Sequence, residues 1–501
     1  MILVIAMKHI RLLALTALLL APLATLQAAD RNFDVTAYGA KGDGLTKNTV
    51  ALQKAIDACA ADGGGKVVFP KGRYLTGSLT LRSHVELHLD EDATLLGSTL
   101  MEDYPPHPFP KFRSLRDKGG FPALIYAEEA EQVAITGPGT IDGQGAAFQP
   151  AKVSNNEDIR PRGILFVSCK NVRVEGGLYL CNAGSWTQHY LNCENVEVHN
   201  IEVFAHATAN NDCIDIDGCR HVRVSGIRGD TYDDGITLKA TGPADCEDVV
   251  VEDCTIASHC AAIKCGTEST GGFRHIRISN ISVVPSVAGK LVYGSRRGST
   301  GIGLMIADGG TLDDVTISNV TIRGPRSPFF IRLGNRSRKH MDGVAVPPVG
   351  VVRNITLSDI TISDVQSKCS WICGLPDHPV ENVTLRNIRI VAPGFAGKVP
   401  ALATDEKGTN YPSENLFYSQ PASALFIRHA RNITLDHLTF ATTTPETRPP
   451  LLAVDVDGLT VRKAEATVPG ERPVFLRGMG VKGLKFTAPK NWGGQGQEIT
   501  P

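Results

Sequence analysis

Three short segments of the sequence carry residues that could do chemistry, and they share one hydrophobic register. They read Asn-Asn-Asp-Cys-Ile-Asp over 210–215, Asp-Asp-Gly-Ile-Thr-Leu-Lys over 233–239, and Ser-His-Cys-Ala-Ala-Ile-Lys over 258–264. Aligned on their isoleucines, they place Asp212 and Asp234 at equivalent positions, with Asp233 one step earlier. On neighbouring strands of one sheet, equivalent positions are about 4.8 Å apart. The alignment therefore predicts a cluster of three carboxylates.

Such a cluster suits acid–base chemistry better than it suits folding. Like charges so close repel, so at least one carboxyl holds its proton more strongly than a free Asp. Glycoside hydrolysis needs that difference, because a protonated acid donates to the leaving oxygen while an ionised carboxylate activates water, and separations of roughly 6.5 to 9.5 Å favour inversion. We predict Asp233 as the acid, with Asp212 and Asp234 holding the water. A lone Asp is more often a turn residue, and Asp215 and Asp217 are interpreted that way.

Three basic residues accompany the acidic cluster in the same alignment. His259 falls near Asp234, where an imidazole would tune the acid or bind a sugar hydroxyl, although a lone His is more often a solvated loop residue. Lys239 and Lys264 lie on the coils that carry the cluster. Each is predicted to neutralise a substrate carboxylate, with a solvated strand-end charge as the alternative.

Three further residues are candidates for contacts with substrate. Trp186 and His189 lie one coil earlier and would form a sugar-stacking platform, or else the Trp belongs to the core. Arg332 is a candidate carboxylate clamp, since a guanidinium binds carboxylates bidentately, with an internal ion pair as the alternative.

A repeated phrase defines the elements that must position these residues. An apolar residue, two polar residues and a β-branched alternation recur, as in Cys-Lys-Asn-Val-Arg-Val from Cys169 and in the phrases that begin at Cys193, Cys219, Cys246 and Phe273. The spacings of 24 to 27 residues fit three short strands and their turns. We predict an all-β, single-stranded right-handed parallel β-helix.

The repeat also predicts how the chain is organised. Wider gaps before Cys169, after Phe273 and after Leu312 predict loops beside a groove, where recognition residues usually lie. A helix over residues 46–61, ended by three glycines, is predicted to cap the open N-terminal end. The expected divisions are a signal peptide over 1–28, an N-terminal strand and capping helix over 29–80, a catalytic β-helix over 81–490 and a tail over 491–501.

Bulk properties narrow the partners and the compartment. The formal net charge of -1 gives no field that would attract nucleic acid or an anionic membrane. Lys8, Arg11, an apolar run over 12–26 and a small-residue site near Ala28 read as a secretory signal, with a retained anchor as the alternative. We expect a monomer, exported to the periplasm or the exterior, with no membrane contact after cleavage.

The twelve cysteines divide into two groups. Cys169, Cys193, Cys219 and Cys246 each begin a repeat, which predicts an internal stack of buried side chains. Cys369 and Cys373, in Cys-Ser-Trp-Ile-Cys, are the best candidates for a disulfide. Because no paired Cys/His spacing accompanies them, no metal site is predicted.

At the three segments that carry the candidate site residues, the sequence resembles glycoside hydrolase family 28, the polygalacturonases and rhamnogalacturonan hydrolases. The resemblance runs from residues 33–40 (Phe-Asp-Val-Thr-Ala-Tyr-Gly-Ala) through 137–143 (Gly-Pro-Gly-Thr-Ile-Asp-Gly) to at least Ile263. The family's Asn-Thr-Asp, Asp-Asp and Gly-His-Gly motifs correspond to the site residues Asn210 and Asp212, Asp233 and Asp234, and His259. The resemblance implies inverting hydrolysis of a pectic polysaccharide or oligosaccharide, with no metal or other cofactor.

The sequence departs from the family's motifs at four places. Asn211 stands where the family has Thr, Ser258 and Cys260 replace the glycines around the His, and no Arg-Ile-Lys segment is present. This leaves a rhamnogalacturonan hydrolase or an exo-galacturonidase as alternatives to a polygalacturonase. Two alternatives of other classes also stay open: a pectate lyase, which uses calcium, and a non-catalytic glycan-binding β-helix.

Overall fold

The third residue of each repeated phrase is polar and forms the turn at which a strand begins. Asn171, Asn195, His221 and Asp248 all adopt left-handed backbone, with φ between 53° and 56°. Short polar side chains tolerate this conformation. Neighbouring turns also bond to each other, since Asn195 Nδ2 donates to Asn171 Oδ1 at 3.0 Å. The turn is therefore repeated from coil to coil, and the β-branched run that follows it always enters the same sheet.

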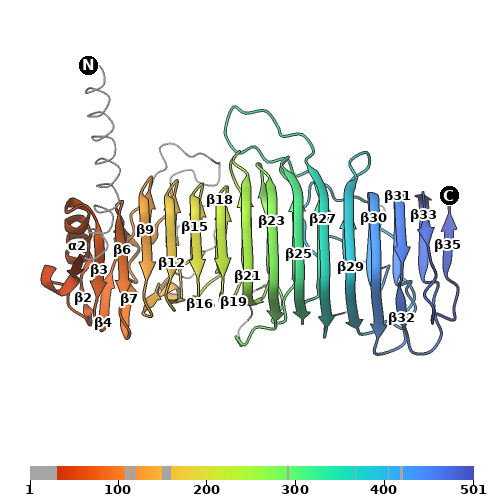
Figure 1. Ribbon diagram of the computed structural model, residues 1–501, viewed down its shortest axis with the longest axis horizontal. Helices are drawn as coiled ribbons and strands as arrows, with labels where there is room; N and C mark the ends of the chain where they lie inside the picture. The colour runs from red at the N-terminus through yellow and green to blue at the C-terminus, as the bar shows by residue number, and fades with distance from the viewer. Residues whose placement is uncertain are drawn as a thin grey trace, which may run out of the picture.

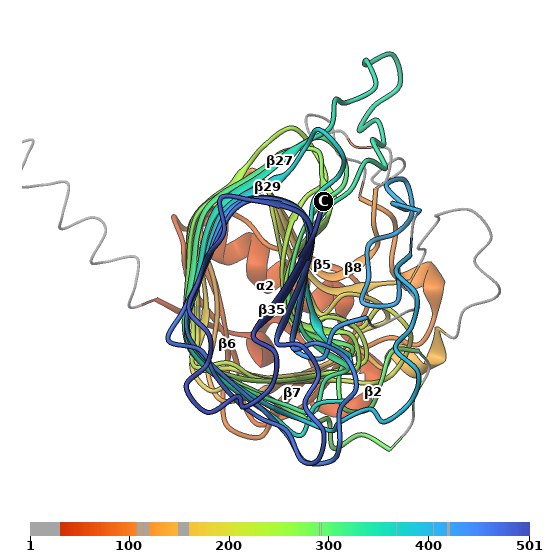
Figure 2. The ribbon, with the colours of Figure 1, turned by 90° about the vertical axis from the view of Figure 1, so that its right-hand side faces the viewer.

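The computed structural model describes residues 31–107, 114, 120–148, 160–289, 291, 293–366, 368–403, 405–417 and 421–501. The predicted signal peptide lies outside them. In these ranges all 35 strands belong to one continuous parallel sheet, wound into a right-handed parallel β-helix as predicted. Figure 1 shows the coils side by side along a rod, and Figure 2 looks along that rod. No helix in these ranges is long and apolar enough to cross a membrane.

Each coil has three faces, which we call the first, second and third sheets. The strands of the first sheet are β5 (Leu79–Thr80), β8 (Ala123–Glu128), β11 (Arg162–Val167), β14 (Gln188–Leu191), β17 (Ile214–Asp217), β20 (Ile236–Ala240), β22 (Ala261–Ser269), β24 (Thr300–Ile306), β26 (Ser327–Leu333), β28 (Ser370–Cys373), β33 (Leu476–Lys482) and β35 (Gln497–Thr500). The strands confined to the second sheet are β1 (Asn32–Asp34), β3 (Gly65–Phe69), β6 (Val85–Leu89), β9 (Glu131–Thr136), β12 (Lys170–Glu175), β15 (Glu194–His199), β18 (Arg220–Ser225) and β34 (Lys485–Phe486).

The third sheet completes the coil. Its own strands are β2 (Asp43–Lys47), β4 (Gly72–Thr76), β7 (Ala93–Gly97), β10 (Thr140–Asp142), β13 (Tyr179–Cys181), β16 (Glu202–Ala205), β19 (Arg228–Thr231) and β32 (Glu465–Thr467). Longer strands run around the corner between sheets: β21 (Cys246–Ser258), β23 (Phe273–Val284), β25 (Thr311–Arg323), β27 (Val351–Ser363), β29 (Val380–Ala392), β30 (Leu425–Thr442) and β31 (Leu451–Arg462).

The predicted capping helix is present as α2 (Thr49–Ala61), three residues shorter at its start. Its buried face consists of Leu52, Ala55, Ile56 and Cys59, which join the main core at the first coil. Figure 1 shows α2 at the N-terminal end of the rod. The short 3-10 helices are η1 (Val35–Tyr38), η2 (Met101–Asp103) and η4 (Gly145–Ala147).

The predicted cysteine stack is confirmed. Cys169, Cys193, Cys219 and Cys246 are all buried in the core, and the Cys193 N–H donates to Cys219 Sγ at 3.2 Å. The predicted disulfide is wrong, because Cys369 and Cys373 are both free. Cys369 directly precedes β28 and Cys373 is its last residue, and a four-residue step along a strand spans about 13 Å, far beyond the reach of a disulfide.

The irregular gaps in the repeat correspond to segments that leave the coil. Residues 285–299 connect β23 to β24, residues 334–350 connect β26 to β27, and residues 393–424 connect β29 to β30. Figure 2 shows inserted segments outside the coil. The loops predicted after Phe273 and after Leu312 are therefore confirmed as insertions.

Candidate active site

The acidic cluster lies where three consecutive coils pass from the third sheet into the first. β17 pairs with β20 through Ile214 and Ile236, and β20 pairs with β22 through Ile236 and Ile263, which is the predicted register. The N–H of Cys213 donates to the Asp234 carbonyl at 2.9 Å. Asp212 and Asp234 therefore occupy equivalent positions on adjacent coils, as the alignment requires.

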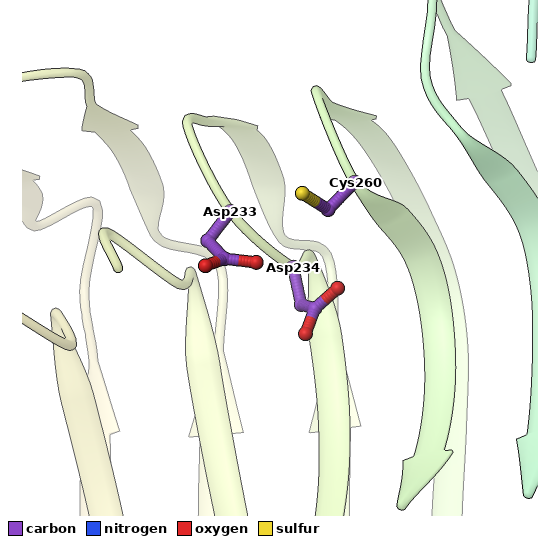
Figure 3. Close-up of side chains that lie close together, drawn as sticks. All are labelled: Asp233, Asp234 and Cys260. Carbon is purple, nitrogen blue, oxygen red and sulfur yellow. The ribbon is translucent and has the colours of Figure 1, made fainter. Parts of the chain in front are cut away.

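Asp233 is held by neutral donors. Tyr293 Oη donates to its Oδ2 at 2.5 Å, and Asn210 Nδ2 donates to the same oxygen at 3.3 Å. Asp233 is half-buried, and desolvation and the charge of Asp234 raise its pKa. Figure 3 shows Asp233 and Asp234 side by side, with Cys260 reaching toward them from the next coil. Asp233 is thus the carboxyl whose surroundings favour a retained proton while it stays accessible.

Asp234 is held by a cation instead. Lys264 Nζ lies 2.5 Å from its Oδ2, and the N–H of Ala261 donates to its Oδ1 at 3.0 Å. Both Asp234 and Lys264 are buried. Burial is the largest single effect on the pKa of Lys264 and lowers it, but the combined attraction of Asp234 and the other acidic groups around it raises the net pKa well above the ordinary value. Asp234 and Lys264 therefore form an ion pair, whereas the neighbouring Asp233 is held by the neutral donors Tyr293 and Asn210.

Lys239 forms a second group of buried ion pairs in the cluster. Lys239 Nζ is 3.9 Å from Asp212 Oδ2, 3.4 Å from Asp215 Oδ1 and 3.6 Å from Glu268 Oε2. Desolvation, together with the neighbouring Asp215, raises the pKa of Asp212 well above its usual range. Desolvation likewise raises the pKa of Asp215 to about 7, although Lys239 opposes the rise. Asp212 and Asp215 therefore share one buried cation and retain protons readily.

The two Asp residues interpreted from sequence as turn or strand-flank residues differ in the structure. Asp217 bonds to a turn, since it accepts from the Thr241 N–H at 2.9 Å and from Thr241 Oγ1 at 2.8 Å. Asp215 instead lies on β17 with no exposed surface and pairs with Lys239. Its place in the cluster follows from strand alternation, which puts it on the same outward row as Lys264 through their common neighbour Thr237.

Trp186 and His189 form a buried layer beside Lys239. The Trp186 ring is 7% exposed, with Arg162 Cζ 4.4 Å and Lys239 Nζ 4.5 Å from its centroid. His189 lies 2.6 Å from Arg162 through Nδ1, and burial and that guanidinium lower its pKa to about 4. Neither ring presents an open face, so the structure does not bring them to the accessible side of the cluster.

His259 lies in an aromatic group instead of pairing with Asp234. Its ring is fully buried, 5.0 Å from the His206 ring and 5.3 Å from the Tyr232 ring, and neither ring nitrogen has a hydrogen-bond partner. Burial lowers the pKa of His259 to about 4, and His206 adds to this effect. His206 in turn pairs with Asp230 at 2.8 Å. His259 is therefore a neutral imidazole next to the turn that carries Asp233.

Arg332 is not placed with the carboxylates. Its guanidinium is fully buried, and Nη1 donates to the Gly374 carbonyl at 2.7 Å while Nη2 donates to the Glu406 carbonyl at 2.5 Å. Burial lowers its pKa. Arg332 thus joins the backbone just after β28 to that of the 393–424 insertion, a role that neither the clamp nor the ion-pair prediction anticipated.

Three contributors to the site were missed by sequence reasoning. Tyr293 and Tyr411 come from insertions, outside the repeat that sets the register. Arg160 precedes β11, and its guanidinium donates to Asn210 Oδ1 at 2.8 Å and to the Ala209 carbonyl at 2.6 Å. The gaps in the repeat spacing were the only signal that pointed toward the two tyrosines.

Only one part of the cluster has the donor set for a metal ion. Among the described residues, oxygens of Asp233 and Asp234 and the sulfur of Cys260 lie within 4.8 Å of one another. Lys264 already places an ammonium 2.5 Å from Asp234 Oδ2. A cation would have to displace that charge, so these residues do not fit a metal site well.

A parallel β-helix that brings Asp residues together on consecutive coils offers the pair of carboxyl groups that glycoside hydrolases use. The sequence model described as "Glycosyl hydrolases family 28" matches residues 59–402, and the chain belongs to this family. It is accordingly a glycoside hydrolase.

Individual relatives agree with this assignment. A probable polygalacturonase of Vitis vinifera is 29% identical over 390 residues, which cover 74% of this chain and 76% of the relative. An exo-poly-alpha-D-galacturonosidase of Dickeya chrysanthemi is 39% identical over 127 residues, which cover 24% of this chain and 21% of the relative. The crystal structure of a hyperthermoactive exopolygalacturonase from Thermotoga maritima covers 72% of this chain and 87% of its own at a TM-score of 0.60 and 23% identity, which shows the shared fold.

Proposed function

We propose that the protein hydrolyses α-linked galacturonate-containing chains of pectin with inversion at the anomeric carbon. The relatives named as polygalacturonases support this substrate class. The observation that carries the mechanism is the contrast between neighbours: Asp233 is held by the neutral groups Tyr293 and Asn210, whereas Asp234 is held by Lys264. One carboxyl is suited to donate a proton and the other to accept one.

In the proposed reaction, Asp233 gives its proton to the glycosidic oxygen as the bond to the anomeric carbon breaks. A water molecule on the opposite face of the sugar attacks that carbon and loses its proton to Asp234, and Asp212 orients the water. Atoms and charges balance, because one proton leaves Asp233 and one arrives at Asp234. Attack from the face opposite the leaving group inverts the configuration, although oxygens of Asp233 and Asp234 lie within 4.8 Å of one another, closer than the roughly 6.5 to 9.5 Å usual for inverting enzymes. Inversion is therefore proposed from the family resemblance, and the separation of these carboxyls does not support it.

The buried lysines have a different proposed role from the one expected from sequence. Lys239 and Lys264 each pair with the protein's own carboxylates, so we assign them to holding Asp212, Asp215 and Asp234 in place. A substrate carboxylate then needs an accessible cation. Arg296 is exposed, and its charge acts on His259 at the edge of the cluster. It is the candidate for that contact.

The test is product analysis on polygalacturonan and rhamnogalacturonan with matched variants. Asp233→Asn is expected to reduce kcat by about 10²- to 10⁴-fold. Asp57→Asn changes an exposed carboxylate that pairs with Arg82 and should leave turnover unchanged. Proton NMR of the first product should show the β-anomer released from an α-linked chain.

Three outcomes would contradict the proposal. Release of the α-anomer would exclude inversion. Unsaturated products whose formation stops on addition of a chelator would indicate a lyase. Binding of pectic chains without turnover by the unmodified protein would leave a glycan-binding β-helix.

A further inference from the structure

A tyrosine from a distant insertion lies next to the catalytic cluster. Tyr411 belongs to the 393–424 insertion, and its Oη lies 3.3 Å from Lys264 Nζ, the ammonium that pairs with Asp234. The Lys264 ammonium is 5.9 Å from the centroid of the Tyr411 ring. Only one side chain therefore separates the ring from the proposed base.

Tyr411 as a whole residue is exposed, although it lies beside buried charges. It is 56% exposed, whereas Lys264 beneath it is 6% exposed. The neighbouring insertion adds Arg338, which is half-exposed and donates to Glu268, the residue that also pairs with Lys239. A single exposed aromatic residue is common on protein surfaces, but Tyr411 also contacts the ammonium that pairs with the proposed base, so it is placed where a bound sugar would meet it.

The backbone on which Tyr411 sits is firmly held. Glu406 is fixed through its carbonyl, which accepts from Arg332, and through its carboxylate, which pairs with Arg428. Two residues later, the Gly408 carbonyl accepts from the Asn335 N–H at 2.5 Å. The segment that leads to Tyr411 is therefore anchored to β26 through Arg332 and to β30 through Arg428.

We propose that Tyr411 binds substrate by stacking its ring on a pyranose unit beside the sugar that Asp234 and Asp233 act on. A tyrosine suits this role because its flat face covers the C–H surface of a sugar while its hydroxyl stays with polar partners, here Lys264. Residues 405–411 of the insertion thereby form a wall of the proposed substrate cleft, and Arg332 and Arg428 act as positioning residues for that wall. This inference rests on the proposed hydrolysis of galacturonate chains.

The test compares Tyr411→Ala, Tyr411→Phe and a control, Tyr179→Ala, which removes a half-buried ring on the third sheet. On oligogalacturonides, Tyr411→Ala should raise KM about tenfold with kcat within about threefold, because stacking contributes to binding before and during the reaction. Tyr411→Phe keeps the ring and should stay within about threefold of the unmodified enzyme in both constants. The control should match the unmodified enzyme.

Calorimetric titration of an inactive Asp233→Asn protein with oligogalacturonide gives the second readout. Adding Tyr411→Ala should weaken binding by a similar factor. An unchanged KM and an unchanged Kd in an enzyme that hydrolyses the substrate would overturn the role of Tyr411 alone. Absence of hydrolysis by the unmodified enzyme would overturn the proposed function instead, so the two failures are distinguishable.

Discussion

Tyr293 Oη lies 2.5 Å from Asp233 Oδ2 and at the same time accepts the N–H of Asn210 at 2.7 Å. Because the backbone N–H occupies the acceptor side of the hydroxyl, the Tyr293 proton is directed at the carboxyl. The proposed general acid thus receives its closest hydrogen bond from a residue 60 positions away in the chain.

Replacing Tyr293 with Phe should move the alkaline limb of the pH–rate profile upward. The Tyr293 hydrogen bond lowers the pKa of Asp233 against the stronger rise caused by desolvation. A general acid must be protonated, so activity falls as pH rises through its pKa. Without the donor that pKa is higher, and the limb should shift to higher pH. The profile of kcat/KM measures it, with Tyr190→Phe in the core as the control. A shift toward lower pH would contradict the assignment.

Replacing Lys264 with Met should separate a role on the enzyme from a role on the substrate. The change keeps a long side chain but removes the ammonium that pairs with Asp234. We expect kcat to fall about 10²- to 10³-fold while KM changes by less than about threefold. Steady-state kinetics give both constants, and Lys71→Met, which removes an exposed partner of Asp92, serves as the control. A raised KM at unchanged kcat would contradict this role and would support the substrate contact that the sequence predicts for Lys264.

Replacing Arg332 with Met should loosen the wall that carries Tyr411. The two backbone carbonyls that lose a charged donor belong to Gly374 and Glu406. Loss of these two hydrogen bonds should lower the free energy of unfolding by about 2 to 4 kcal/mol and speed proteolysis within residues 393–424. Urea unfolding and limited digestion measure the two effects.

A matched control for Arg332→Met is Arg353→Met, which breaks an exposed ion pair with Asp313. An exposed pair contributes less than about 1 kcal/mol, so that variant should unfold almost as the parent does. Equal stability and equal digestion of the two variants would refute the anchoring role.

The cysteines give a prediction about covalent structure. All twelve are free, and burial raises the pKa of most of them, that of Cys369 to about 12. Unfolding in denaturant without reductant should therefore expose twelve thiols to a thiol reagent, while the folded protein reacts slowly. Addition of reductant should leave Tm unchanged. A titre below twelve would reveal a disulfide.

The repeat was readable because it depends on neighbours in sequence. A short polar residue in left-handed backbone must begin each coil, and a β-branched alternation must follow it. The phrases that begin at Cys169 and Cys193 therefore fix the register between their own strands. Once coils stack, equal positions in the repeat become adjacent in space. The pairing of Ile214 with Ile236 then places Asp212 against Asp234 without any knowledge of the rest of the chain.

The sequence by itself determined the coil, its register and the approach of Asp212, Asp233 and Asp234, because each follows from periodicity over some 25 residues. The tertiary structure decided which partner each carboxyl has: Lys264 for Asp234, Tyr293 for Asp233, and the sharing of Lys239 between Asp212 and Asp215. It also decided that Tyr411, 147 residues from Lys264 in the chain, lies 3.3 Å from the ammonium of that lysine. The insertions do not follow the repeat, so the repeat could not predict which insertion residues contact the carboxyls. The burial of a carboxyl, which shifts its pKa, depends on the segments that cover the strand, so the repeat could not predict its protonation either.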